Sequence, residues 1–187
     1  MIAVWIIIGL AVVLVAWLIL TYNSLVTVRN EVDEAWSDID VQLKRRHDLI
    51  PNLINSVKGY VKHEAGTFEK ITALRSEAMK AQNSGDMKAI ATAEKNLQAG
   101  IMPLLGYQEN YPDLKADSTF LDLQAQLTDT ENKVQASRRF YNGNVKNFNT
   151  KLQVFPTNII AGMFKFVARE FFGIEEEAER AVPEVKF

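Results

Sequence analysis

The sequence contains no cysteine and only two histidines among its 187 residues. The lack of cysteine excludes disulfides, thiolate nucleophiles and cysteine-based metal sites, and it leaves the redox compartment undetermined. The scarcity of histidine weakens the case for metal-dependent or general-base chemistry. On one straight helix, the sixteen-residue separation of His47 and His63 rotates them about 160° apart. We therefore do not expect the two histidines to share a metal ion.

The chain also lacks an excess of basic residues. Its 21 lysines and arginines are balanced by 23 acidic residues, which gives a net charge of −2 and a pI near 5.8. Proteins that bind nucleic acid usually carry a basic excess, so we expect no nucleic-acid partner. The sequence has no glycine-rich phosphate loop, no G-x-S-x-G turn and no HExxH pair. We therefore expect neither catalysis nor a cofactor.

The first part of the chain lacks charge altogether. Residues 2–20 read IAVWIIIGLAVVLVAWLIL, and about 20 apolar residues suffice to span a bilayer. A cleaved signal peptide is the main alternative, but it needs a basic start and small residues at its cleavage site. The sequence from Leu18 to Tyr22 does not supply such a site. A buried core helix is a second alternative, although hydrophobicity on all sides is unusual in a small domain.

We predict that residues 1–21 form a single-pass anchor in the cell (inner) membrane, with residues 2–20 contacting the lipid bilayer. Basic residues near the end of a span favour the cytoplasmic side. Arg29 and then the run Lys44-Arg45-Arg46 follow the anchor, whereas no basic residue precedes it. We therefore expect the N-terminus outside and the soluble domain in the cytoplasm.

The longest regular pattern after the anchor lies between Glu34 and Tyr60. Two series of apolar positions spaced by seven, offset by three and four residues, form one stripe on a single helix face. The first series is Trp36, Leu43, Ile50 and Val57, and the second is Leu25, Val32, Ile39, Arg46, Leu53 and Tyr60. This stripe predicts a long helix that packs against other helices, with Arg46 as a charged member of its packing face.

We expect this helix to extend from Tyr22 to about Gln82, and it can continue from the anchor. Pro51 is the main irregularity, because proline in a helix interior lacks an N–H donor and costs about 3 kcal/mol. The stripe keeps its phase on both sides of Pro51, which favours a kink. The alternative places Pro51 in the first turn of a second helix. Beyond Tyr60 the stripe changes phase, which predicts a local shift of the packing face.

Turn signals separate the following helices. The pair Gly85-Asp86 suits a helix C-terminus and the next N-cap, which predicts a second helix from Met87 to about Leu105. Tyr111-Pro112 marks a bend, and Asp117 or Ser118 caps a third helix that ends near Gln153. The predicted apolar face of the second helix is Met87, Ile90, Leu97, Ile101 and Leu104.

The third helix carries its own apolar stripe with two charged residues on it. One series is Phe120, Leu127, Val134, Tyr141, Phe148 and Phe155, and the other is Gln124, Glu131, Arg138, Val145 and Leu152. We predict that Arg46 meets Glu131 across a helix interface, with Arg138 nearby. Alternatively, these side chains reach water from the edge of the stripe. A buried contact would fix register more than add stability, because desolvation roughly cancels attraction.

An aromatic segment, NIIAGMFKFVAREFFGI, follows Phe155-Pro156. Helical spacing places Ile160, Phe164, Val167 and Phe171 on one face, which predicts a short amphipathic helix. In one interpretation this helix closes the bundle. In the other it contacts the membrane interface through Phe164, Phe171 and Phe172. Four glutamates between residues 175 and 179 would be repelled by anionic lipid, which favours the first interpretation.

Several blocks of the sequence resemble the bacterial LemA proteins. The first extends from Tyr22 to Glu64 and includes EAWSDIDVQLKRRHDLIPNL. The others are YPDLKA at 111–116, LQAQLTDTENKV at 123–134, RRFYNGNVKNFN at 138–149 and FPTNIIA at 155–161. The resemblance covers most of the chain from Tyr22 to Phe172. One departure is Gly143-Asn144, where a better helix former is usual, and it predicts a soft spot in the third helix.

This resemblance implies a membrane-tethered all-α bundle with an uncleaved anchor, the N-terminus outside and the domain in the cytoplasm. The family includes relatives associated with bacterial magnetosome membranes. Its biochemical function is not established, so the resemblance supplies no catalytic residues.

Together these observations predict an all-α protein. A transmembrane helix at 1–21 precedes an antiparallel bundle of about four unequal helices at 22–172, the first and third long, and an acidic, flexible tail follows at 173–187. We expect a membrane-anchored scaffold that binds a protein partner or a second copy, because heptad stripes also serve oligomers. The first alternative is a membrane-remodelling module that uses the C-terminal aromatic helix. The second is a hydrolytic or signalling enzyme with a site built from Arg45, His47, Asp48 and Glu131.

Overall fold

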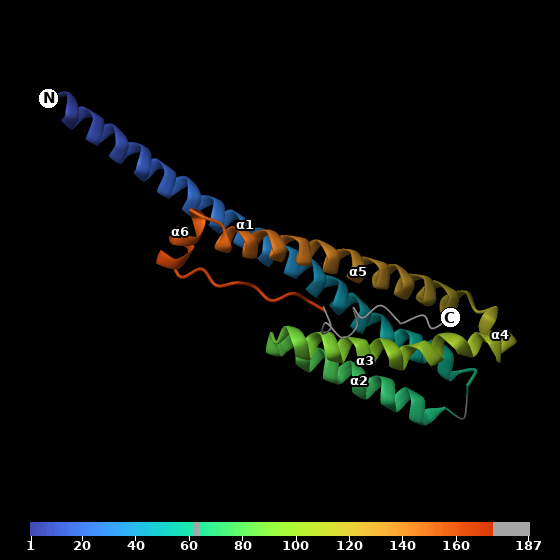
Figure 1. Ribbon diagram of the computed structural model, residues 1–187. Helices are drawn as coiled ribbons and strands as arrows, with labels where there is room; N and C mark the ends of the chain where they lie inside the picture. The colour runs from blue at the N-terminus through green and yellow to red at the C-terminus, as the bar shows by residue number, and fades with distance from the viewer. Residues whose placement is uncertain (62–63, 174–187) are drawn as a thin grey trace, which may run out of the picture. The chain divides into compact units, whose positions relative to one another are not determined.

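The structure, a computed structural model, describes residues 1–61 and 64–173, and within these ranges every regular element is a helix (Figure 1). This confirms the all-α class. The elements are α1 (Ile2–Lys58), α2 (Ala65–Ser84), α3 (Met87–Gly106), the 3-10 turn η1 (Tyr107–Glu109), α4 (Pro112–Lys115), α5 (Ser118–Gln153) and α6 (Thr157–Met163). The predicted acidic tail lies outside the described residues, except for Gly173. The domain boundaries at 21 and 172 stay a prediction.

The contacts between residues divide the chain into two compact units. One unit combines Met1–Ile39 with Arg139–Glu170, and the other combines Asp40–Arg138 with Phe171–Phe187. Helices α1 and α5 each contribute to both units, because each runs past a boundary. We call the first the anchor unit, because it contains the apolar residues 2–20. We call the second the cluster unit, because it contains a cluster of buried charged residues that includes Arg46 and Glu94.

In the anchor unit, the first part of α1 packs against the last part of α5 and against α6. Leu25, Ile160 and Ala161 form a small buried core. Farther along, Tyr141 on α5 is 2% exposed, and its ring lies edge-on to Trp36 at 5.6 Å between centroids. The apolar side chains of residues 2–16, by contrast, are exposed, as expected for a segment that contacts lipid.

In the cluster unit, α1, α2, α3 and α5 share one apolar core. It is centred on the buried residues Ile50, Leu53, Ile71, Leu97, Leu104, Leu114 and Phe120. Helices α2 and α3 approach closely at Gly100, where an added Cβ would lie 2.6 Å from Leu74 Cδ1. The predicted N-cap at Asp86 is present, since its carboxylate accepts hydrogen bonds from the Lys88 and Ala89 amides.

The prediction of one helix from Tyr22 to Gln82 is wrong. Helix α1 continues through Pro51 but ends at Lys58, and a turn at Gly59-Tyr60 follows. Gln82 Nε2 lies 2.6 Å from Asp40 Oδ1, and Arg75 Nε lies 2.7 Å from the His47 carbonyl. These pairs show that α2 runs back antiparallel to α1. The phase change beyond Tyr60 therefore reflects a chain reversal, which apolar spacing alone cannot distinguish from a shifted packing face.

The predicted amphipathic helix through Phe171 is also shorter than expected. Helix α6 ends at Met163, and Lys165 adopts a left-handed conformation with φ 55°. The Asn149 side chain forms two 2.9 Å hydrogen bonds with the Arg169 backbone, accepting from its N–H and donating to its carbonyl. The Tyr141 hydroxyl donates to the Glu170 carbonyl at 2.9 Å. These side chains of α5 satisfy the backbone groups that a longer helix would have paired internally.

Candidate functional site

The cluster unit contains a group of buried charged side chains, called the charge cluster here: Arg46 and His47 on α1, Glu94 on α3 and Glu131 on α5. Arg46 Nη1 donates to Glu94 Oε2 at 2.8 Å, and His47 Nε2 is 2.7 Å from Glu94 Oε1. Because an ionised carboxylate only accepts, this contact assigns the Nε2–H tautomer to His47 beside an ionised Glu94. Arg46, His47 and Glu94 are each less than 7% exposed. Glu94 thus bridges two consecutive residues of α1.

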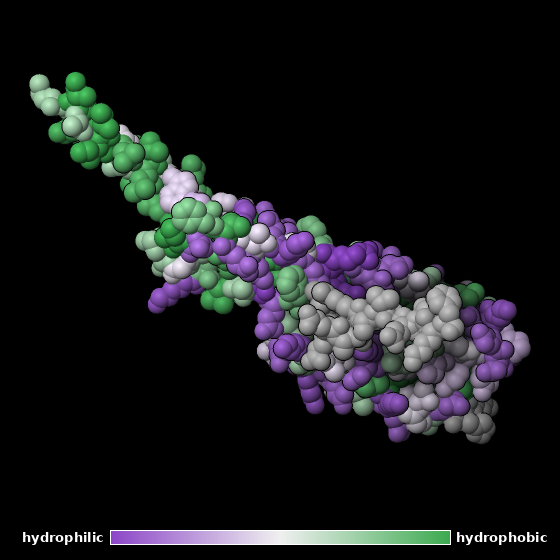
Figure 2. All heavy atoms as spheres, in the orientation of Figure 1, coloured by the Kyte–Doolittle hydropathy of each residue, from purple (hydrophilic) through white to green (hydrophobic). Residues whose placement is uncertain are grey.

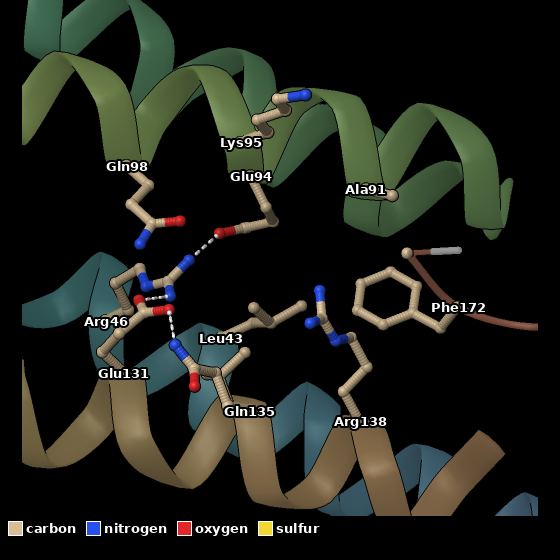
Figure 3. A pocket seen from close by; sticks show the side chains of 12 residues that line it. Leu43, Arg46, Ala91, Glu94, Lys95, Gln98, Glu131, Gln135, Arg138 and Phe172 are labelled. Carbon is tan, nitrogen blue, oxygen red and sulfur yellow. Dashed lines mark hydrogen bonds and ion pairs between the residues drawn. The ribbon is translucent and has the colours of Figure 1, made fainter. Parts of the chain in front are cut away.

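Arg46 also reaches the third helix of the cluster. Its Nη2 forms an ion pair with Glu131 Oε2, and Gln135 Nε2 donates to Glu131 Oε1 at 3.3 Å. Figure 3 shows the Arg46 guanidinium held between the carboxylates of Glu94 and Glu131. Glu131 is partly open to solvent, with 25% of its side chain exposed. One arginine therefore connects α1, α3 and α5.

Two of the three residues predicted to form a polar contact belong to the charge cluster, and the third lies beside it. The contact between Arg46 and Glu131 is present in the structure, and the burial of Arg46 excludes the alternative that its side chain reaches water. Arg138 is exposed and lies beside Phe172 (Figure 3). Among the described residues its guanidinium has no hydrogen-bond or ion-pair partner. It is near the cluster but does not join it.

Glu94 is the residue that the sequence analysis missed. The apolar face of α3 repeats at 87, 90, 97, 101 and 104, and position 94 belongs to the same face. An acidic residue at position 94, on an otherwise apolar helix face, indicates a buried polar contact, as Arg46 does in the stripe of α1. A buried carboxylate needs a cationic or hydrogen-bonding partner. The acidic Glu94 on one apolar face and the basic Arg46 on another therefore predict a contact between them.

Pro51 creates a second polar contact in the same unit. In an α-helix the N–H of residue 51 would donate to the carbonyl of His47, but proline has no N–H. Arg75 Nε on α2 donates to that carbonyl at 2.7 Å instead. The carbonyl that Pro51 leaves without a helical donor therefore binds α2. The His47 backbone contacts α2, and its side chain contacts α3.

A cleft of about 400 Å³ opens beside the charge cluster. Its walls come from α1, α3 and α5, and residues 172–173 close one side. Its lining includes Arg46, Glu94, Lys95, Glu131, Gln135 and Arg138, with apolar surface from Leu43, Val134 and Phe172. The charged side chains in this lining are three basic and two acidic. The cleft therefore combines a slight positive excess with apolar walls.

The residues of the alternative enzyme site do not come together. Asp48 is exposed and pairs with Lys44 at 2.9 Å, and this hydrogen bond holds the pKa of Asp48 below its usual value. Arg45 lies 3.4 Å from Asp129 instead of facing His47. Over residues 1–61 and 64–173, no group of three or more His, Asp or Glu side chains is arranged to hold a metal ion. His63 lies outside the described residues.

The three aromatic residues predicted to contact membrane have different environments. Phe164 is 55% exposed, and its ring centroid is 4.6 Å from that of Tyr22 at the end of the anchor. Phe171 is 41% exposed. Phe172 is buried in the wall of the cleft, so its prediction as a lipid contact is wrong. It lies beyond the end of α6 at Met163, whereas the prediction assumed that the amphipathic helix continued through this segment.

Comparison with known sequences matches residues 35–187 to the LemA family. The chain belongs to the LemA family. One similar LemA relative is "Protein LemA" of Metamycoplasma hominis, 34% identical over 140 residues, which are 74% of this chain and 63% of the relative. The family member described here therefore corresponds to less than two thirds of that relative's length.

Two further relatives of this LemA family member are named as magnetosome proteins. "Magnetosome protein MamQ 2" of Paramagnetospirillum magneticum is 23% identical over 184 residues, 86% of this chain and 68% of the relative. "Magnetosome protein MamQ" of Magnetospirillum gryphiswaldense is 21% identical over the same shares. Helix α1 is also long and apolar enough to cross a membrane. The family and this helix together indicate a membrane-associated helical protein.

Proposed function

We propose that this chain is a non-catalytic scaffold, anchored by residues 2–20 in the inner membrane, that binds a protein partner through the cleft of the cluster unit. One observation carries the proposal. Helix α1 is continuous from Ile2 to Lys58, so the apolar anchor and the buried stripe from Leu25 to Val57 belong to one element. Within the anchor unit, such a helix continues directly from the apolar span into the folded residues around Leu25, without a flexible linker.

The charge cluster supports a structural role rather than a catalytic one. Both Glu94 oxygens are occupied by Arg46 and His47, and Arg46 is shared with Glu131. Catalytic acids and bases need a position within reach of a substrate proton. Glu94 and His47 are buried and bound to one another, which favours a role in holding three helices together.

The cleft is the surface that we assign to the partner. The apolar stripes of α1 and α5 are mostly buried within the chain itself, so they do not remain available for a coiled coil with a second copy. The cleft is open, has apolar walls and carries Arg138 without an ion-pair partner among the described residues. We therefore favour an acidic segment of another protein as the occupant.

Site-specific photo-crosslinking of the intact, membrane-bound chain tests this assignment. A photoreactive side chain at Gln135 lines the cleft, whereas one at the exposed Asn132 on the same helix does not. We expect a discrete adduct with another protein from position 135 and none from 132. The adduct should weaken on adding the substitution Arg138→Ala, which removes the positive charge.

Light scattering of the detergent-solubilised chain provides the second measurement. An adduct of two identical chains, together with a dimeric mass, would assign the cleft to a second copy. A strict monomer that gives no adduct from Gln135 in its native membrane would contradict the scaffold proposal. The membrane-remodelling alternative loses its long amphipathic helix, because α6 ends at Met163.

A further inference from the structure

The anchor unit exposes a group of large apolar side chains around α6. This α6 surface consists of Val154, Phe155, Ile159, Met163, Phe164 and Val167, each at least 46% exposed. Phe155 continues the apolar stripe of α5 but is 79% exposed, because the chain turns at Pro156. Several large apolar side chains exposed on neighbouring parts of a folded unit mark a site of interaction with a protein or a membrane.

The same element packs directly on the end of the anchor. Trp17 and Leu18 lie against the buried pair Ile160 and Ala161 of α6. Tyr22 stacks obliquely on Phe164, with 4.6 Å between ring centroids, and Lys151 Nζ donates to Ser24 Oγ at 2.9 Å. These contacts fix α6 beside residues 17–24 of α1. Figure 2 shows the apolar surface of the anchor continuing onto this region.

The length of the anchor sets the depth of that contact. At 1.5 Å per residue, a helix that enters the bilayer at Ile2 crosses a core of about 30 Å in about 20 residues. Trp17 and Tyr22 then lie near the membrane–water interface, where such aromatic side chains are enriched. Because α6 packs on this part of α1, its exposed apolar side chains lie at the same level.

We propose that the α6 surface is a second lipid contact, inserted into the interfacial region of the leaflet in which the anchor ends. Its occupant is the bilayer itself, because the surface is continuous with the membrane span and has the depth of the headgroup–acyl boundary. Lys165, exposed at its edge, can extend its ammonium group to lipid phosphates while its stem covers apolar surface. The inference rests on the anchoring part of the proposed function but not on a protein partner.

The absence of cysteine allows a direct test on the full chain. Single cysteines at Ile159 and Val167 report on the α6 surface, one at Val12 reports on the anchor, and one at the exposed Lys146 on α5 reports on solvent. Each is labelled with an environment-sensitive fluorophore and reconstituted into phosphatidylcholine–phosphatidylglycerol nanodiscs with one chain per disc. Nitroxide quenchers are carried either near the lipid headgroup or near the end of the acyl chain.

We expect labels at 159 and 167 to shift to the blue and to be quenched most strongly by the headgroup-proximal nitroxide, because interfacial elements insert only about 5–10 Å. The label at Val12 should respond most to the deeper quencher, and the label at Lys146 to neither. Adding Ile159→Asp should reduce quenching at 167 at least severalfold. The matched change Val41→Asp, at an apolar residue exposed in the cluster unit, should leave it unaltered.

Three outcomes would overturn the inference. Labels at 159 and 167 that behave like the one at Lys146 would show a solvent-exposed surface. A blue shift without quenching by either lipid would assign the surface to protein contact. If the label at Val12 is not quenched by the deeper nitroxide either, the anchor itself does not insert. That result would contradict the anchoring part of the proposed function as well as the inference about the α6 surface.

Discussion

At the scale of single residues, Glu94 is the carboxylate that contacts both Arg46 and His47 in the charge cluster, one through each oxygen. Glu94 accepts from Arg46 at 2.8 Å and lies 2.7 Å from the His47 ring. Replacing Glu94 with Leu removes the only carboxylate that contacts His47 among the described residues and leaves Arg46 with Glu131 alone. Loss of one partner of a buried ion pair typically costs about 3–5 kcal/mol.

We therefore expect Glu94→Leu to lower the free energy of unfolding by about 3–5 kcal/mol, measured by urea denaturation of the reconstituted chain. Lys44→Ala is the control, because its partner Asp48 is an exposed residue, and it should leave the midpoint near that of the parent. A loss no larger than in the control would show that the cluster contributes nothing to stability.

Arg46→Met tests the separate hypothesis that the cluster fixes register. A methionine has similar length without charge, so it can fill the interface, but it cannot select one alignment of α1 against α3 and α5. We expect a more heterogeneous structure, seen as multiple distances between spin labels placed on α1 and α3. A single distance distribution identical to that of the parent would contradict this role.

Asp117 provides a prediction for pH. It accepts from the Tyr60 hydroxyl at 2.7 Å and from the Thr119 and Phe120 amides at the start of α5. The Tyr60 hydrogen bond, followed by the Phe120 amide, holds the pKa of Asp117 below its usual value of 3.8. A lowered pKa in the folded state means that these contacts stabilise fully above pH 3.8 and are lost as pH falls through the folded pKa.

We expect the amide of Phe120 to lose protection from hydrogen exchange only below the ordinary pKa of aspartate. Asp117→Asn keeps an N-cap acceptor but does not titrate, so in that variant the dependence on acid should disappear. Loss of protection at or above pH 3.8 in the parent, or the same profile in the variant, would contradict the assignment. The carboxyl resonance of Asp117, followed through the titration, gives an independent value.

At the scale of elements, Pro51 and Arg75 form a coupled pair. The His47 carbonyl lacks a helical donor because of Pro51, and Arg75 supplies one. A neutral hydrogen bond contributes about 0.5–1.5 kcal/mol, and one from a charged group about 1.5–3 kcal/mol. Arg75→Ala should therefore destabilise the parent chain, whereas Pro51→Ala restores the backbone donor.

We expect the cost of Arg75→Ala to fall by about 1 kcal/mol or more in the Pro51→Ala background. Free energies of unfolding for the parent, the two single variants and the double variant complete the cycle. Gln82→Ala serves as the control, because Gln82 also joins α2 to α1, at Asp40, but far from the proline. Additive effects of Pro51 and Arg75 would show that the carbonyl does not need the arginine.

The elements also show which features the sequence determines locally. The stripe of α1 predicts the burial of Leu25, Val32, Ile39, Leu43 and Ile50, because helical period and packing face are properties of one segment. The reversal after Lys58 was not predictable in the same way, since Gly59 alone is a weak breaker. The end of α6 depends on hydrogen bonds from Tyr141 and Asn149 on another helix. Tertiary partners of this kind leave no periodic signal.

At the scale of the whole molecule, the same distinction applies to the candidate site. Charged residues in the stripes of α1 and α5 predicted a contact between Arg46 and Glu131, and the structure contains that ion pair. The sequence could not reveal that Glu94 on α3 also binds Arg46, because the place of α3 follows from the chain reversal after Lys58. The cleft likewise could not be predicted, because Phe172 and Gly173 in its lining are far in sequence from the α1, α3 and α5 residues that form its other walls.

Membrane orientation is the remaining property of the whole chain that can be predicted. Arg29 and the basic run 44–46 lie after the anchor, and the side with more lysine and arginine stays in the cytoplasm. A single cysteine inserted between Met1 and Ile2, ahead of the membrane span, and one at the exposed Lys146 report on the two sides. A membrane-impermeant maleimide should label the inserted cysteine in intact spheroplasts and position 146 only after permeabilisation. The parent chain has no cysteine and is the unlabelled control. Labelling of position 146 before permeabilisation would contradict the predicted orientation.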